Sequence, residues 1–274
     1  MKLIKGEIYY PQKRNNNPVK WLAICAHQDD AEIMAIDGIL KGYYSNKNSF
    51  ALIETTDGAG ITQKEKYPNL SIEQIKNLRN KEQKEASEIG KYNSIYLLGY
   101  TSDEVKDINN KNIISEYIKI ITELKPEIVY THSILDKHPT HVSVALKVIE
   151  AIRNMPTYLQ PKKIYGCEVW RSLDWVSDEK KIIFDISKNI KLQKSLLDVY
   201  KSQIIDGKEY SKSTIARRIQ NSTYAKSHQD DEYKLSTFAI DMTPLINDKS
   251  LNIDEYALSF IDDLKNEVLN NFKK

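Results

Sequence analysis

The sequence predicts an α/β fold in which helices cover both faces of a mainly parallel sheet. Short, nearly continuous apolar runs alternate along the chain with longer segments whose apolar residues recur every three or four positions. The short runs are typical of strands buried on both faces, and the longer segments are typical of amphipathic helices. Regular alternation of the two favours parallel strands joined by helical crossovers.

The first half of the chain supplies three of the expected strands and three of the expected helices. The strands are residues 21–26, 50–55 and 94–98, and the helices are residues 31–44, 71–89 and 113–124. Ser71 and Gln74 have the spacing of a capping box, which sets the start of the second helix. Gly90 is expected to end that helix, and Pro126 to end the third.

The alternation continues in the middle of the chain. Residues 127–131 and 163–169 are expected strands, and residues 139–153 are the helix between them. Two further amphipathic helices are expected, near residues 187–203 and over residues 253–272.

One polar segment interrupts this pattern. Residues 202–231 are rich in lysine and lack clear periodicity, which predicts an ordered loop region over a ligand pocket rather than a linker. The sequence contains no repeat and no low-complexity linker. We therefore expect one domain over residues 1–274, with residues 205–274 as a C-terminal elaboration over the pocket.

Composition and charge argue against several classes of function. The formal net charge is only +2 and the lysines are scattered, so no nucleic-acid partner is expected. No segment has the apolar length of a signal peptide or a membrane span. Cys25 and Cys167 fall in expected strands without CxxC spacing, which predicts buried thiols in a reducing compartment. A cytoplasmic protein is expected, and a homo-oligomer stays open.

Two clusters of acidic residues and histidines follow expected strands. His27-Gln-Asp-Asp30 comes after the first strand, and Asp136-Lys-His-Pro-Thr-His141 comes after the fourth. Buried carboxylates cost several kcal/mol each unless a partner such as a metal ion compensates them. Ligands of parallel sheets bind at the carboxyl ends of the strands, so both clusters are expected at one shared metal site.

The types of residue in the two clusters suit a hydrolytic zinc site. Catalytic zinc takes three protein ligands and keeps a fourth position for water. We assign His27, Asp30 and His141 as ligands and Asp29 as the general base that accepts a proton from the water. Zn²⁺ is the expected cofactor, and Fe²⁺ is an alternative at the same ligands.

The second cluster also has the pattern of a helix start. Pro139 suits the first helical position, which makes His138 the cap and places His141 in the first turn on the same side. The helix N-terminus disfavours imidazolium, which keeps His141 a neutral ligand. His138 is the expected electrophile or proton donor, and Asp136 would support it by pairing with it. Taken alone, either cluster would suit a capping or turn role better than a metal.

At these residues the chain resembles the PIG-L/LmbE-like family of zinc-dependent N-acetylglucosaminyl deacetylases. The family motif Ala-His-Pro-Asp-Asp-x-Glu matches Ala26–Glu32 except at Gln28, and Asp-x-His-Pro-Asp-His matches Asp136–His141 except at Thr140. Looser matches are Arg79–Glu82, Thr55–Gly60 and Lys201–Gln203. The resemblance covers roughly residues 20–205.

The resemblance implies a Rossmann-like three-layer fold and removal of an N-acetyl group from a small-molecule amino-sugar conjugate. It also implies zinc at His27, Asp30 and His141, Asp29 as base, and His138 as stabiliser of the oxyanion or acid to the amine. Arg79 and Asp136 are the expected substrate contacts. Thr140 replaces the aspartate that tunes His138 in the family, and Asp136 remains as its partner.

Several other interpretations are compatible with parts of the sequence. An amidase of a larger thiol or antibiotic conjugate would use the same site, and so would a sugar-binding protein whose catalysis has decayed. A phosphoesterase is disfavoured because the sequence has one metal's worth of ligands and no Gly-rich phosphate cradle. His228-Gln-Asp-Asp231 repeats the first cluster without a preceding strand, which favours a solvated loop. Core packing is the default for Trp170.

Overall fold

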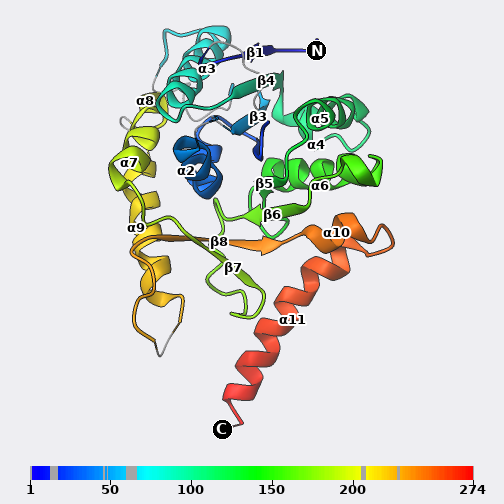
Figure 1. Ribbon diagram of the computed structural model, residues 1–274, viewed down its shortest axis with the longest axis vertical. Coiled ribbons are helices and arrows are strands. Elements are labelled where there is room, and N and C mark those ends of the chain that lie inside the picture. Colours follow the sequence, from blue (N-terminus) through cyan, green and yellow to red (C-terminus); the bar gives the residue numbers. More distant parts are fainter. Residues whose placement is uncertain are drawn as a thin grey trace.

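The fold places an eight-stranded sheet between two layers of helices (Figure 1). The computed structural model describes residues 2–12, 18–45, 47, 49–59, 67–204, 208–226 and 229–273. In spatial order the strands are β1 (Glu7–Tyr9), β4 (Ser94–Tyr100), β3 (Phe50–Thr56), β2 (Trp21–Cys25), β5 (Ile128–His132), β6 (Lys163–Cys167), β8 (Ser236–Asp241) and β7 (Lys181–Asp185). The five expected strands are all present, within one or two residues of their expected ends.

The sheet is mainly parallel, as predicted, but its edges are antiparallel. Strands β4, β3, β2, β5 and β6 pair in parallel. β1 joins one edge antiparallel to β4, and β8 and β7 extend the other edge in the same way. Numbered along the chain, the parallel strands have the order 3-2-1-4-5 of doubly wound sheets. The order reverses between β2 and β5, and these are the strands that precede the two clusters.

Helices bury both faces of the sheet. One face packs against α1 (Asp30–Met34), α2 (Ile36–Tyr44), α3 (Ile72–Ile89) and α7 (Ile190–Asp198). The other packs against α4 (Ser102–Lys106), α5 (Lys111–Leu124), α6 (Pro139–Arg153) and α10 (Thr243–Asn247). Leu22 and Ile24 of β2 point into the second layer, and Ala23 and Cys25 into the first. Because both faces are buried, the strand needs apolar residues at every position.

Two expected helices are divided in the structure. The helix expected over residues 31–44 breaks at Ala35, which caps α2. The helix expected near residues 187–203 is interrupted after α7, and α8 (Lys201–Ile204) follows. The capping box of Ser71 and Gln74 at the start of α3 is confirmed.

The loop predicted over residues 202–231 is wrong, because half of this segment is α9 (Tyr210–Tyr224). Apolar periodicity does not reveal this helix because its buried face is polar. The buried residues are Ser211, Thr214, Arg218, Asn221 and Ser222. Ser211, Thr214, Arg218 and Asn221 are three or four positions apart, and Ser222 is four positions after Arg218, as on one helix face.

The C-terminal part of the chain contributes to the sheet as well as to its surroundings. β8 lies between β6 and β7, so the residues after 205 are not only a cover over a pocket. A short 3-10 helix (Thr157–Leu159) precedes β6. The last helix, α11 (Ile253–Asn271), extends away from the body (Figure 1) and buries only Phe260.

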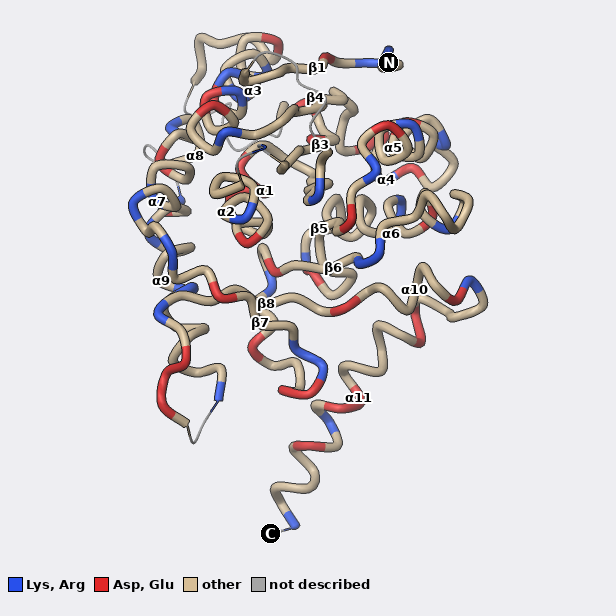
Figure 2. The backbone as a smooth tube through the Cα atoms, in the orientation of Figure 1, with Lys and Arg blue, Asp and Glu red and all other residues tan. Residues whose placement is uncertain are grey.

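Basic and acidic residues are interspersed along the described chain (Figure 2). Within the described ranges, none of the helices combines the length and apolarity needed to cross a bilayer. Cys25 and Cys167 are free and buried, as predicted.

Candidate metal centre and active site

The turn after β2 brings His27 and Asp30 together. The backbone N–H of His27 donates to Asp30 Oδ2 over 2.8 Å, and the N–H of Asp30 donates to the His27 carbonyl over 3.1 Å. Asp30 is therefore the first residue of α1 and not its cap. Asp29 precedes it with φ of 95° and makes no side-chain capping bond. A non-glycine residue rarely adopts this backbone conformation, and here it turns the Asp29 side chain into a cavity.

The segment after β5 starts α6 as the sequence predicted. His138 is the N-cap, Pro139 is the first helical residue and His141 lies in the first turn. The rings of His138 and His141 stack with centroids 4.4 Å apart. His138 lines the cavity, while His141 is completely buried below it.

Three ligand atoms from the two segments converge. His27 Nδ1 lies 3.2 Å from His141 Nε2, and Asp30 Oδ2 lies 3.3 Å from His27 Nδ1 and 3.4 Å from His141 Nε2. Tetrahedral ligand atoms 2.0–2.1 Å from a zinc ion would be about 3.3 Å apart. The donor set and its spacing therefore fit zinc. This fit could not be read from sequence, because His27 and His141 are 114 positions apart.

A second group of potential ligands among the described residues lies behind the first. It consists of His132, Asp136 and His141, and none of the three lines the cavity. His132 Nε2 accepts the N–H of Ala26 over 2.9 Å, and its ring stacks on His141 at 3.8 Å. His132 is thus positioned to support the ligands rather than to bind an open metal site.

Asp136 supports His141 rather than His138. Its Oδ2 lies 3.5 Å from His141 Nδ1, and its Oδ1 accepts the backbone N–H of His138 over 2.9 Å. The expected pairing with the His138 ring is not present, because the ring turns toward the cavity. Asp136 does not line the cavity, so the geometry gives no support to its prediction as a substrate contact. A carboxylate behind a ligating histidine orients the ring and sets its tautomer.

Burial and neighbouring groups set the protonation states at the site. Burial raises the pKa of Asp30, but the adjacent His141 and His132 imidazoles outweigh it and hold this pKa well below its usual range. Burial lowers the pKa of His141 to about 4. Both residues are thus in the protonation state that a metal ligand needs at neutral pH.

Asp29 and His138, which both face the cavity, have different environments. Burial, followed by the charge of Asp30, raises the pKa of Asp29 well above its usual range. Burial and the nearby His27 lower the pKa of His138. His138 Nδ1 has no hydrogen-bond partner in the structure, and Thr140 lies at the cavity where the family motif has aspartate. His138 is therefore neutral at pH 7.

Arg79 connects two loops at the cavity wall. Its Nη1 donates to the Gly58 carbonyl over 2.9 Å, and its Nη2 donates to the Gln28 carbonyl over 3.0 Å. Gln28 donates to Asn80 over 2.9 Å, and a Cβ on Gly58 would lie 2.3 Å from Gln28 Oε1. Gly58 also has φ of +69°, so this turn requires glycine. Arg79 lines the cavity and also fixes the loop that carries Asp29, while its contact with a substrate stays a prediction.

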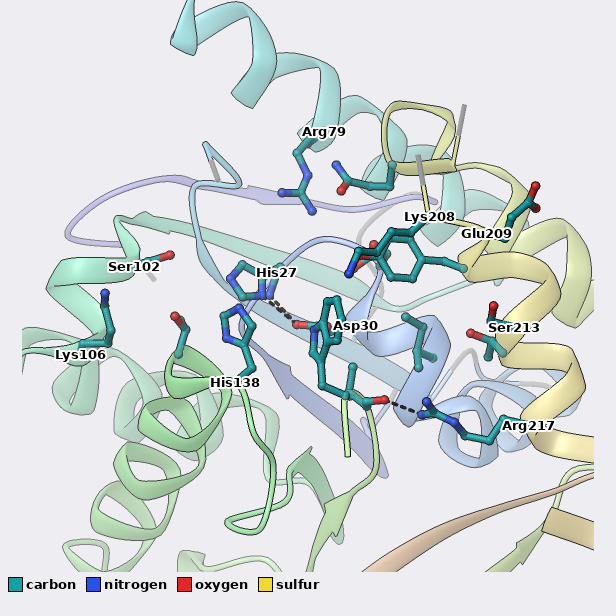
Figure 3. A pocket seen from close by; sticks show the side chains of 18 residues that line it. His27, Asp30, Arg79, Ser102, Lys106, His138, Lys208, Glu209, Ser213 and Arg217 are labelled. Carbon is teal, nitrogen blue, oxygen red and sulfur yellow. Dashed lines mark hydrogen bonds and ion pairs between the residues drawn. The ribbon is translucent and has the colours of Figure 1, made fainter. Parts of the chain in front are cut away.

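The cavity has a volume of about 820 Å³ and draws its walls from both halves of the chain (Figure 3). The sequence did not single out the wall residues of α4, which are Ser102 and Lys106, or those near α9, which are Lys208, Glu209, Tyr210, Ser213, Thr214 and Arg217. The polar spacing on α9 was the available signal. Trp170, expected in the core, is partly exposed and lines this wall.

Comparison with known families agrees with this geometry. The model of the PIG-L family, described as GlcNAc-PI de-N-acetylase, matches residues 22–152. Residues 22–152 belong to the PIG-L family. This PIG-L region contains both clusters and Arg79, whereas α9 and its cavity wall lie outside it. No curated protein matches the chain.

Solved structures share the fold at low sequence identity. The N,N'-diacetylchitobiose deacetylase of Pyrococcus horikoshii has a TM-score of 0.64 and 18% identity, over 89% of this chain and 91% of that one. The A40926 pseudoaglycone deacetylase Dbv21 has a TM-score of 0.60 and 14% identity, over 82% and 97%. GalB, a 4-carboxy-2-hydroxymuconate hydratase of Pseudomonas putida, has a TM-score of 0.60 and 15% identity, over 82% and 96%. One fold thus hosts different reactions, and function must be argued from the site.

The structure describes only part of the segment 228–231, which repeats the residues of the first cluster. His228 lies outside the described residues. Asp231 is exposed and accepts a hydrogen bond from Thr223 Oγ1 over 3.0 Å. The prediction of a solvated loop stays untested at His228.

Proposed function

We propose that the protein is a zinc-dependent hydrolase that removes the N-acetyl group from an N-acetylglucosamine-type conjugate. One observation carries the proposal. Three ligand atoms of zinc spacing converge at the floor of a cavity that also exposes Asp29 and His138, all within the PIG-L region. The deacetylases among the structural neighbours support the same class of reaction.

Three residues of the site would bind the ion, and the ion would activate water and the acyl group. His27, Asp30 and His141 would hold the ion, with Asp136 orienting His141. A bound zinc ion lowers the pKa of a coordinated water to about 7 and polarises an acyl oxygen. The same donor set would also accept Fe²⁺.

Asp29 is the group that would move the proton. Its carboxylate faces the cavity and its pKa is raised by burial and by Asp30, so it can accept a proton from the attacking water. The same proton can then pass to the nitrogen of the amide as its C–N bond breaks. A group that first accepts and then donates a proton works best when its pKa is shifted toward the working pH, and the surroundings of Asp29 raise its pKa.

His138 would stabilise the charge that develops on the acyl oxygen. As a neutral imidazole it donates one N–H, and its ring edge is at the cavity. The lowered pKa makes it a better hydrogen-bond donor than proton source. Arg79 would hold the Asp29 loop and contact the sugar from the opposite wall.

A second candidate keeps the site and changes the substrate. The cavity is near the upper end of the roughly 300–1,000 Å³ common for small-molecule pockets. This volume favours substrates larger than a monosaccharide, such as an amide conjugate of a thiol or antibiotic.

We also propose a single domain and, from the two buried free thiols, a reducing compartment such as the cytoplasm. Whether the chain forms a homo-oligomer stays open.

The proposal is tested by assaying metal-loaded protein on a panel of N-acetylated amino sugars and their larger conjugates. Release of acetate should require zinc. The variant Asp29→Asn should retain zinc, because Asp29 is not a ligand, and should lose about 10²–10⁴ in kcat. His141→Ala should lose the metal, measured by elemental analysis. Binding without hydrolysis of any panel member would favour the decayed sugar-binding protein, and full activity of Asp29→Asn would contradict the assigned base.

A further inference from the structure

We propose that Lys208 and Arg217 form a subsite for an anionic group, a carboxylate or a phosphate, on the part of the substrate distant from the amide. The proposal rests on the proposed deacetylase function and adds to it the charge of the conjugate. In Figure 3, Lys208 and Arg217 lie on one side of the cavity and Lys106 lies on the other. His27 and His138 lie between these two sides.

Arg217 is fixed beside the cavity with much of its guanidinium free. It lies on α9, and its Nη1 donates to the carbonyl of Val169 (Figure 3). No other hydrogen bond or ion pair joins it to the residues that the structure describes. One anchored nitrogen leaves the remaining N–H groups of the planar fork for an anion, the geometry that suits a carboxylate or phosphate.

Lys208 places a second positive charge near the same wall. Its Nζ lies 4.3 Å from the centroid of the Trp170 ring, a distance at which a cation is attracted to the ring face. Within the described chain, no carboxylate lies within ion-pair distance of this amine. Glu209, the acidic neighbour, pairs with Lys212 over 3.1 Å.

The other positive side chains of the cavity wall are already engaged. Lys106 pairs with Asp103 over 2.8 Å. Arg79 uses both terminal nitrogens on backbone carbonyls. The uncompensated positive charge of the described wall is therefore concentrated near α9, where it would attract an acidic group.

Trp170 connects the reacting end of the cavity to this charge. Its ring lies 6.2 Å from His138 at an interplanar angle of 28°, and its other neighbour is Tyr210, edge-on at 6.1 Å. The backbone N–H of Trp170 donates to Asp136 Oδ2, the carboxylate oxygen that faces His141. A sugar with its acetamide at Asp29 and His138 could lie along Trp170, and its distal substituent would reach Lys208 and Arg217.

The test compares pairs of N-acetylglucosaminides that differ only in the charge of the aglycone. The probes are a neutral alkyl glycoside, its carboxylate-bearing analogue and its phosphate-bearing analogue, so that the two anion sources are distinguished. The ratio of kcat/KM for acidic over neutral substrate should exceed 1, and it should fall about 10-fold or more in Lys208→Gln and in Arg217→Gln. Arg217→Lys should restore part of the ratio, since it retains the charge.

The matched control is Lys194→Gln, which removes an exposed lysine of α7 that does not line the cavity and should leave the ratio unchanged. Calorimetric titration of zinc-loaded Asp29→Asn with the same glycosides measures binding without turnover. A ratio near 1 in the parent protein, or equal affinities for acidic and neutral glycosides, would overturn the subsite. Tighter binding of an acidic glycoside without hydrolysis of any substrate would support the subsite and contradict the deacetylase function.

Discussion

Asp29 and Asp30 are adjacent and buried, yet their pKa values move in opposite directions. Asp30 is surrounded by His27, His132 and His141, which keep its carboxylate ionised. Asp29 is buried and lies beside the charge of Asp30. Both effects raise its pKa, so its carboxylate is protonated more easily. Two carboxylates with different environments can divide metal binding and proton transfer between them. Asp29 holds its position with φ of 95°, a backbone conformation that residues other than glycine rarely adopt.

A third carboxylate near the site has no visible partner. Glu54 lies on β3 with both oxygens completely buried and without hydrogen-bond partners in the structure. Burial, followed by the charges of Asp30 and Glu32, raises its pKa well above the usual range. Since the folded-state pKa is raised, the stability contribution is present below the unfolded-state value and is lost as the pH rises through the folded-state value.

We therefore expect Glu54→Met to stabilise the metal-free protein, and more strongly at pH 8 than at pH 5. The gain at pH 8 should be on the order of 1–3 kcal/mol, the cost of an unsatisfied buried polar group. Urea unfolding of the chelator-treated protein at the two pH values measures it. Glu54→Gln is the matched control, because it removes the charge but keeps two polar atoms, and should abolish only the pH dependence. Destabilisation by Glu54→Met at both pH values would show that the carboxyl is stabilising.

The helix α9 could not be predicted from apolar periodicity, because its buried face is polar. It is held by polar contacts, chief among them those of Arg218, which is 2% exposed. Its Nη1 donates to Gln193 Oε1 over 2.9 Å, and its Nη2 donates to the carbonyls of Glu32 and Ile33 over 2.6 and 3.2 Å. Burial lowers the pKa of Arg218 to about 9, so it is still charged at neutral pH. Arg218 thus ties α9 to α7 and α1 and sets the position of the wall that carries Arg217.

Replacing Arg218 by alanine should destabilise the protein by roughly 2–4 kcal/mol, because three buried acceptors would lose their donor. The midpoint of urea unfolding measures the loss. Lys212→Ala, at an exposed position of the same helix, should stay within about 0.5 kcal/mol. Equal midpoints for the two variants would mean that α9 is held by other contacts.

The whole molecule is organised around the reversal of strand order between β2 and β5. The turn after β2 carries His27 and Asp30, and α6, which follows β5, carries His141, so a bound ion would link the two halves of the parallel sheet. The start of α9 and the residues just before it complete the cavity from the C-terminal part, and the antiparallel strands β8 and β7 extend the sheet beyond β6. A ligand that binds only this assembled arrangement stabilises the entire fold by mass action.

Zinc at 100 times its dissociation constant should therefore stabilise the protein by about 2.7 kcal/mol. For a chain of this size the corresponding rise in Tm is roughly 5–10 °C. Thermal unfolding with zinc and with a chelator measures the difference. His141→Ala should remove the shift, while Asp29→Asn should keep it. An equal shift in His141→Ala would place the ion elsewhere.

The sequence by itself determined the parallel core and the two halves of the site. Buried parallel strands need continuous apolar runs, and a carboxylate or imidazole directly after such a run needs a partner; both requirements are visible in the residues around His27 and His138. Tertiary structure decided what depends on distant contacts. Asp136 faces His141 because the turn after β5 directs it there, and α9 forms because a polar face finds buried partners in α1, α7 and β8. Apolar periodicity records burial in a core, but it carries no trace of a buried polar face or of the wall that such a helix adds to a cavity.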